Sequence, residues 1–296
     1  MSAAATTMSG RTKRQARSSP WGDAWRRYRR NRMAFISAFV AGLILFCGIF
    51  APIIAPHPYD YSVLADTLQG PSAKYLLGTD EVGRDLLSRI IYGARTSMTV
   101  GFFVPVIGVV IGMPIGAAGG WFGGRVDFFV QRLLEGFTAI PTILLAIFLV
   151  TLYGSGIVNV TLFIGVTTWV GFARLTRAQF LALRDREFVT AARAIGTRPW
   201  RIMLSHILPN AAGPIIILFV LTIPGAVFGE AGLSFLGLGV QDPIPSWGKM
   251  ITEGGQYMQS APLIGLLPML CLGLTMLSFS FVGDGLRDAL DPNALE

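Results

Sequence analysis

Residues 96–124 read TSMTVGFFVPVIGVVIGMPIGAAGGWFGG and contain no Asp, Glu, Lys or Arg. Roughly 20 apolar residues are enough for a helix to cross the hydrocarbon core of a bilayer. Lipid offers no hydrogen-bond partners, so a spanning segment must pair its backbone groups internally. The run does not alternate polar and apolar residues, as the strands of a membrane barrel do. The stretch therefore predicts a transmembrane helix.

The rest of the chain repeats this pattern. Four further windows lack charged side chains: 33–59, 136–173, 202–229 and 254–283. The window 136–173 is long enough for two short crossings, because YGSG at 153–156 supplies a turn. Only 14% of all residues are charged, whereas soluble domains carry about 25%. We expect an all-α polytopic membrane protein with six transmembrane helices, near 33–55, 97–120, 131–153, 157–178, 207–232 and 262–283.

The net charge of +7 could suggest nucleic-acid binding, but its distribution points to membrane topology. With the amino terminus inside, 19 of the 24 Lys and Arg residues fall on the cytoplasmic side. The positive-inside rule then predicts that both termini are cytoplasmic, and we expect no nucleic-acid partner.

The spans divide the chain into five parts. These are a cytoplasmic tail and interfacial segment (1–32), the first helix (33–55), an outer loop (56–95), a five-helix core (96–283) that includes a cytoplasmic loop at 179–206, and a cytoplasmic tail (284–296). Within 77–97 we expect an amphipathic helix capped by Thr79 or Asp80. It would lie on the outer interface or act there as a docking or gating element, and the residues favour neither.

Glycines recur every fourth residue in the second predicted span, at positions 108, 112, 116 and 120. Small residues at this spacing let another helix approach closely. We therefore expect this face of the helix to pack tightly against a neighbour.

The sequence contains few residues that could form a catalytic or metal site. His57 and His206 fall on opposite sides of the membrane, and there is no Cys/His cluster. No stretch matches the phosphate-binding pattern G-x-x-x-x-G-K-[ST]. We expect no enzyme activity, metal or cofactor in this chain, so any ATP and Mg would be bound by other subunits.

Glu230 lies near the outer end of the fifth predicted span. Ionisable residues in membrane segments usually have a function, so Glu230 is a candidate for a pathway or outer-gate residue. The alternative is an acid at a helix end whose side chain reaches water.

The segment EFVTAARAIGTRPW (187–200) predicts a short helix. Glu187 falls in its first turn, with a cap at Asp185 or a neighbour, and Gly196 is a natural stop before Pro199. The helix is too short to span a bilayer and leads directly into the fifth span. Ala191 and Ala192 would form a flat patch that another protein could approach. A helix lying on the membrane surface is the alternative.

The same segment resembles the EAA loop of ABC importer permeases. In that loop E-A-A is followed by three residues, Gly, nine residues and I-x-L-P. Here Ala191, Ala192, Gly196, Leu208 and Pro209 match. Thr190 replaces the Glu and His206 replaces the Ile, which puts in doubt any role for an acid at position 190.

Four further segments resemble the C-type permease of dipeptide and oligopeptide importers. They are the W…Y…RNRMA run (21–34), LGTDEVGRDLLSRIIYGARTS (77–97), LSFLGLGVQDPIPSWG (233–248) and GDGLRDALDPN (283–293). The resemblance covers about 21–293 and implies the type I importer permease (MetI-like) fold. It also implies a bacterial cell membrane location, a homologous B-type permease, two ABC ATPase subunits, an extracytoplasmic binding protein and a peptide substrate.

The resemblance implies that 185–200 is the coupling helix, which rests on one ATPase. The residues it assigns to this contact are Glu187, Ala191, Ala192, Arg193 and Gly196. The run to Pro209 would tie the helix to the fifth span.

Other functions remain open. The same importer type also serves nickel chelates, glutathione and antimicrobial peptides. A secondary, ion-coupled transporter would need ionisable groups at mid-depth, and a membrane enzyme would need convergent catalytic side chains. The uncharged windows hold neither.

Overall fold

The structure is a computed structural model that describes residues 20–290. Residues 1–19 and 291–296, which fall in the two predicted tails, lie outside the described residues. The main elements are α1 (Pro20–Arg30), α2 (Arg32–Ile49), α3 (Ala51–Ile54), α4 (Leu86–Phe122), α5 (Gly124–Thr138), α6 (Thr142–Tyr153), α7 (Ile157–Leu183), α8 (Glu187–Ala194), α9 (Pro199–Ile202), α10 (Leu208–Phe235), α11 (Trp247–Gly255) and α12 (Leu263–Leu290). A 3-10 turn, η1 (Leu64–Asp66), and a π-helical turn, η2 (Met203–Ile207), complete the set.

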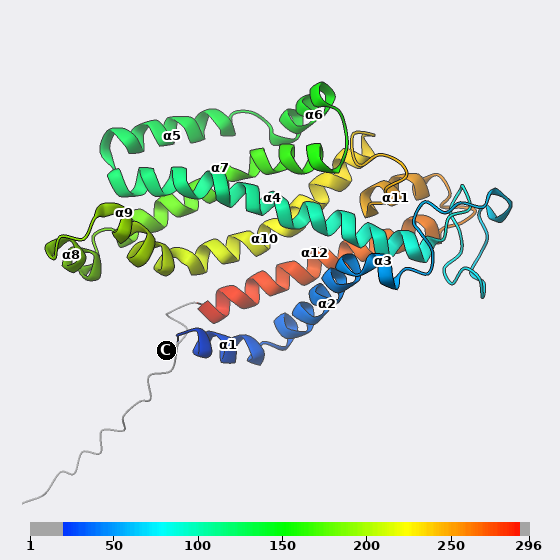
Figure 1. Cartoon of the computed structure of the whole chain (residues 1–296), viewed down its shortest axis with the longest axis horizontal. Coiled ribbons are helices and arrows are strands. Elements are labelled where there is room, and N and C mark those ends of the chain that lie inside the picture. The colour runs from blue at the N-terminus through cyan, green and yellow to red at the C-terminus, as the bar shows by residue number, and fades with distance from the viewer. Residues whose placement is uncertain (1–19, 291–296) are drawn as a thin grey trace, which may run out of the picture.

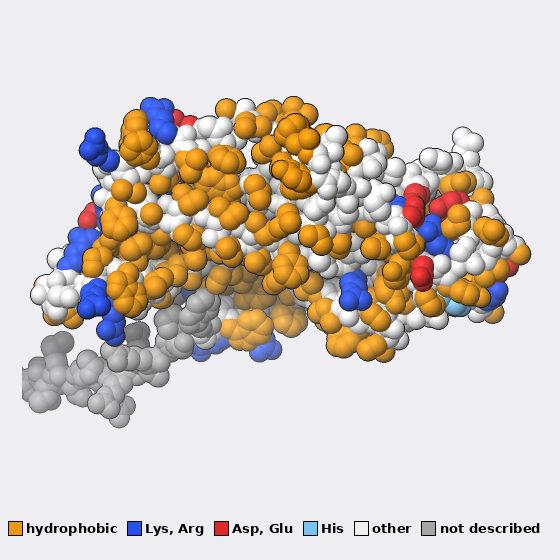
Figure 2. Space-filling model, turned by 45° about the horizontal axis from the view of Figure 1, so that its top comes forward, with side chains coloured by type: hydrophobic (Ala, Val, Ile, Leu, Met, Phe, Trp, Pro, Cys, Tyr) orange, Lys and Arg blue, Asp and Glu red, His pale blue; other side chains and the backbone are white. Residues whose placement is uncertain are grey.

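The long helices lie side by side along the long axis of the molecule (Figure 1). Within the described residues, five helices are long and apolar enough to cross a membrane: α2, α4, α7, the continuous run Pro199–Phe235, and α12. Hydrophobic side chains cover the middle of the face in Figure 2, and most charged ones gather near its two ends. The predicted all-α membrane fold is therefore confirmed.

The third predicted span is bent rather than straight. Helices α5 and α6 together pass as a sixth crossing, but they meet at 76°. Pro141 stands at the N-cap of α6. A proline disfavours helical backbone in the residue before it, so the chain turns there. The straight helix predicted over 131–153 was wrong for this reason.

Helix α4 begins eleven residues before the predicted span at 97–120. The Asp85 carboxylate caps it by accepting a hydrogen bond from the Ser88 N–H at 2.9 Å. The expected separate helix within 77–97, capped by Thr79 or Asp80, was wrong, because these two residues build the preceding loop instead. There Thr79 Oγ1 accepts from the Gln69 N–H, and Asp80 Oδ1 accepts from the Arg84 N–H.

The last span also runs on past its predicted end. Helix α12 continues to Leu290, so the start of the predicted tail at 284–296 is helical. The helix ends beside α1 and the start of α2, where Tyr28 of α1 and Ala34 of α2 pack against it at Gly285.

The glycines of α4 bring its backbone against that of α7. A Cβ atom at Gly112 would overlap the Trp169 carbonyl oxygen, and one at Gly116 would overlap the Ala173 carbonyl oxygen. At Gly108 it would meet the Phe172 ring. The tight packing predicted from the four-residue spacing is confirmed, and its partner is α7.

We expect Gly116→Leu to lower the midpoint of thermal unfolding in detergent. The larger side chain cannot fit between the two backbones, and overpacking costs about 1–3 kcal/mol. The matched control is Gly171→Ala on α7, where an added Cβ meets nothing within 4 Å. Equal shifts in the two variants would contradict a tight contact at Gly116.

Candidate functional site

The segment that resembles a coupling helix forms a compact turn at one end of the molecule (Figure 1). Helix α7 ends at Leu183, and α8 runs from Glu187 to Ala194. The cap was predicted at Asp185 or a neighbour, and the structure has the neighbour: Arg186 is the N-cap residue, and its side chain makes no capping hydrogen bond.

Helix α8 ends in a glycine-dependent cap, as predicted. Gly196 has φ +76°, a backbone conformation that glycine adopts without steric cost. The Gly196 N–H donates to the Arg193 carbonyl and the Thr197 N–H donates to the Ala192 carbonyl. This pair of bonds is the Schellman motif, which satisfies the last carbonyls of a helix. The cap turns the chain sharply into α9.

The two alanines of α8 face different ways. Ala192 is buried beside Val189, in a cluster that includes Phe180, Ile202 and Ile207. Ala191 is exposed. The expected flat patch of both alanines was therefore wrong, because helical geometry turns Ala192 toward the protein's own core. Ile195 is the prominent apolar side chain here, with 82% of its surface exposed.

Arg193 contacts the end of α4. Its guanidinium lies 4.7 Å from the centroid of the Trp121 ring, a cation–π arrangement. Arg184 Nη1 also donates to the Gly120 carbonyl at 3.3 Å. These contacts fix α8 relative to α4 as well as α7. The role of Trp121 could not be predicted from the sequence, because it lies 72 positions before Arg193 in the chain.

The segment between α8 and α10 is short: the non-helical turn 195–198, which contains the capping Gly196, leads directly into α9. Helix α9 passes into η2 and then directly into α10, and Pro209 lies in the first turn of α10. Proline removes one backbone N–H, and a π-helical turn immediately before it absorbs the interruption. Between α8 and α10 the chain therefore consists of one turn at 195–198, held by the Gly196 cap, and otherwise of helix.

Glu230 lies at the other end of α10, far along the helix from Pro209. It is fully buried. Its Oε1 accepts hydrogen bonds from Ser234 Oγ and Ser246 Oγ, both at 2.8 Å. Ser246 is also the N-cap of α11. The alternative of a side chain that reaches water was wrong, since Glu230 instead joins α10 to the start of α11.

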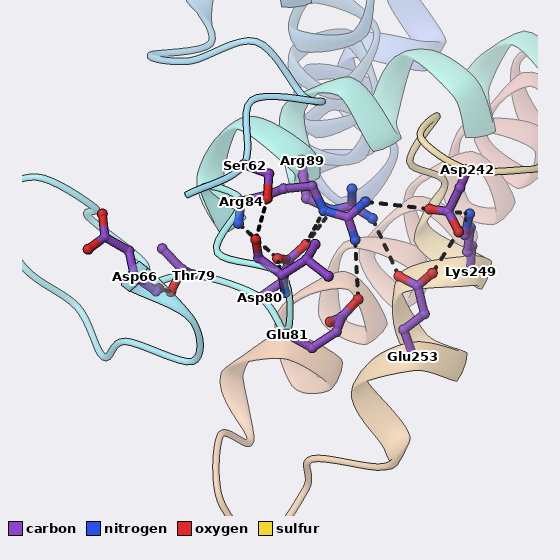
Figure 3. A network of polar contacts seen from close by, with 11 residues as sticks. Ser62, Asp66, Thr79, Asp80, Glu81, Arg84, Arg89, Asp242, Lys249 and Glu253 are labelled. Atoms are coloured by element: carbon purple, nitrogen blue, oxygen red, sulfur yellow. Dashed lines mark hydrogen bonds and ion pairs between the residues drawn. The ribbon is translucent and has the colours of Figure 1, made fainter. Parts of the chain in front are cut away.

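A second polar cluster binds the outer loop to α11 (Figure 3). Arg89 is 1% exposed and pairs with Asp80 at 3.2 Å and with Glu253 at 3.4 Å. Arg84 also pairs with Asp80, at 2.6 Å. Burial raises the pKa of the Glu253 carboxyl. Buried charges require partners, so this cluster fixes the loop in one position.

Lys249 completes this outer cluster at its exposed edge. Its Nζ lies 2.9 Å from Asp242 Oδ1, and the hydrogen bond from Lys249 holds the pKa of Asp242 below its usual range. None of these pairings was predicted from the sequence, and one of them, Arg89 with Glu253, joins side chains 164 positions apart in the chain.

A shallow hollow opens between α6, α7 and α10. It has a volume of about 400 Å³, and its lining includes Thr167, Thr168, Thr222, Gly225 and Gly229. Each of these three threonine hydroxyls donates to a backbone carbonyl of its own helix. The hydroxyl oxygens can still accept hydrogen bonds. The rest of the lining is largely apolar, and the hollow carries no charged side chain.

We expect Arg89→Leu to lower the thermal midpoint markedly. Asp80 and Glu253 would lose a buried partner, and breaking a buried pair costs about 3 kcal/mol or more. Lys74→Leu is the control, because its partner Asp66 lies on an exposed part of the same loop, and we expect little change. Similar midpoints for Arg89→Leu and the unaltered chain would contradict a stabilising role for the cluster.

Two family models match the chain. The model of the binding-protein-dependent transport system inner membrane component matches residues 108–295. The model of the N-terminal TM domain of oligopeptide transport permease C matches residues 19–71.

Similar proteins cover almost the whole chain. The dipeptide transport system permease protein DppC of Alkalihalophilus pseudofirmus is 40% identical over 274 residues, which are 93% of this chain and 90% of the relative. The glutathione transport system permease protein GsiD of Escherichia coli is 41% identical over 278 residues, 93% of this chain and 91% of the relative.

A solved structure shares the fold. A chain of the MetNI methionine ABC transporter, in an inward-facing conformation, aligns with a TM-score of 0.56 and 19% identity. The alignment covers 70% of this chain and 98% of that one. The chain therefore belongs to the family of binding-protein-dependent transport system inner membrane components, as a permease subunit of an ABC importer.

Proposed function

We propose that the chain forms half of the translocation pathway for di- and oligopeptides. The observation that carries this proposal is its identity of 39–40% with two dipeptide permeases over more than nine-tenths of its length. Glutathione is the second candidate, because a glutathione permease is 41% identical. Glutathione is itself a tripeptide, so both substrates belong to one chemical class.

In this proposal, α8 receives the movement of an ATPase subunit. Ile195, Glu187 and Ala191 are exposed and form the contact surface. Arg193 holds α8 on α4 through Trp121, and Gly196 ends the helix. The capped turn at Gly196 and the continuous helical run from α9 through Pro209 carry the movement into α10. Ala192 acts inside the chain, as part of the core that anchors α8.

The importer contains further subunits in this proposal. A companion B-type permease provides the other half of the pathway, two ATPase subunits bind ATP and Mg, and a binding protein delivers substrate outside. The chain itself catalyses no reaction and holds no cofactor. Both of its termini lie in the cytoplasm of a bacterial cell.

The hollow between α6, α7 and α10 is the part of the pathway that this chain supplies. Its threonine oxygens and glycines offer weak, uncharged contacts. Peptides differ in side-chain charge, so an uncharged wall favours none of them. Glu230 serves the outer gate indirectly, by holding Ser246 at the start of α11.

We expect Ile195→Asp to reduce ATP-driven uptake about tenfold, because interface anchors contribute more than 1 kcal/mol when removed. The assay measures uptake and substrate-stimulated ATP hydrolysis in the complete importer. The variant should fold normally, since the Ile195 side chain is exposed. Leu76→Asp on the outer loop is the control, because Leu76 is likewise an exposed aliphatic side chain, and this variant should transport normally. Normal coupling in Ile195→Asp would refute the assignment of α8.

Uptake of labelled substrates tests the proposed function itself. Cells that depend on this importer should take up dipeptides and longer peptides only when ATP is hydrolysed. Thr168→Trp should block uptake of both, because it fills the hollow, whereas Thr151→Trp lies outside it on exposed α6 surface. Uptake of glutathione alone would favour the second candidate, and uptake of neither would reject the peptide class.

A further inference from the structure

Arg95 differs from the other basic residues of the outer side. The outer side carries five Lys and Arg residues, and four of them form ion pairs: Lys74 with Asp66, Arg84 with Asp80, Arg89 with Asp80 and Glu253, and Lys249 with Asp242. Arg95 is exposed on α4, and within residues 20–290 its guanidinium makes no ion pair or hydrogen bond. Its positive charge is therefore unmatched by this chain.

The position of Arg95 along α4 places it at the depth of lipid headgroups. From Arg95 to the inner end of the helix at Phe122 the axis rises about 40 Å, at 1.5 Å per residue. A bilayer including its headgroup regions is about 40–45 Å thick. The uncharged run 96–124 begins at the next residue. Arg95 thus marks the outer edge of the membrane-spanning part of α4.

A groove between α2 and α4 begins at Arg95 and continues toward the bilayer centre. It has a volume of about 490 Å³ and is lined by Leu45, Gly48, Ile49, Arg95, Met98, Thr99, Phe102 and Phe103. Arg95, Thr99 and Phe102 share one face of α4, because residues four and seven positions apart align on a helix. The groove therefore has a cation at its outer end and an apolar wall below.

Gly48 forms the floor of this groove. A Cβ atom there would lie 3.2 Å from the backbone of Ala94 and Arg95, so the glycine lets α2 approach α4 closely. Ile49 and Phe102 stand on either side and are 68% and 49% exposed. Their exposure leaves the groove open along its length.

We propose that this groove binds one anionic phospholipid of the outer leaflet. The phosphate pairs with Arg95, and an acyl chain lies along the groove between α2 and α4. Guanidinium matches phosphate with two parallel hydrogen bonds, which are charge-assisted and strong. A phosphatidylglycerol headgroup carries no cation of its own and can neutralise Arg95. A phosphatidylcholine headgroup is already neutral, so it gains less from the pairing.

Photo-crosslinking tests this site directly. The full chain, purified with the subunits that accompany it, is placed in phosphatidylcholine nanodiscs with a trace of phosphatidylglycerol that bears a photoreactive acyl chain. Mass spectrometry then measures adducts on peptides from 42–50 and 98–103. We expect adducts there, and about fivefold fewer in Arg95→Gln, the factor that one surface cation contributes to anionic lipid binding.

Three comparisons complete the test. Arg95→Lys should keep most of the labelling because it keeps the positive charge. Lys74→Gln is the matched control: it removes one positive charge elsewhere on the outer side and should leave the labelling unchanged. Photoreactive phosphatidylcholine should label the groove about fivefold less than phosphatidylglycerol. Equal labelling by the two lipids, or unchanged labelling in Arg95→Gln, would overturn the proposal. A groove labelled by neither lipid would also overturn it and would indicate that another subunit covers this face.

Discussion

The close contact between the backbones of α4 and α7 is the constraint on which the rest of the structure depends. It exists because Gly112 and Gly116 carry no side chain where the two helices meet. Both helices extend beyond the contact at each end. Fixing their middle parts therefore also fixes the end beside α8, where Trp121 meets Arg193, and the opposite end, where Asp85 starts α4.

Charged groups are separated into two regions that continuous helices connect. At the α8 end, the turn 195–198 leads into α9, which continues through η2 into α10 without a break. At the outer end of α10 the buried Glu230 carboxylate holds Ser246, the cap of α11. Helix α11 then carries Glu253 into the ion-pair cluster with Arg89. Packed or hydrogen-bonded elements therefore connect α8 to the ion-pair cluster of Arg89 at the other end of the protein.

Local sequence patterns predicted helices well and their junctions poorly. The uncharged windows located every span, because the need to satisfy backbone groups in lipid acts on each segment separately. The start of α4 was predicted wrongly because several residues between Thr79 and Asp85 can cap a helix. Which of them caps the helix depends on the loop, where Asp80 is already engaged by Arg84 and Arg89.

The sequence by itself determined the all-α membrane fold and the glycine stop of α8, because each rests on interactions between residues close in the chain. The glycine spacing of α4 also predicted tight packing, but only the structure showed that α7 is the partner. The tertiary structure alone decided that Ala192 faces inward, that Glu230 is buried, and that Arg89 is paired while Arg95 is not. These outcomes depend on partners from distant segments. Hydrophobicity and spacing can place a side chain in the membrane or at its edge, but only the packed helices determine which groups surround it.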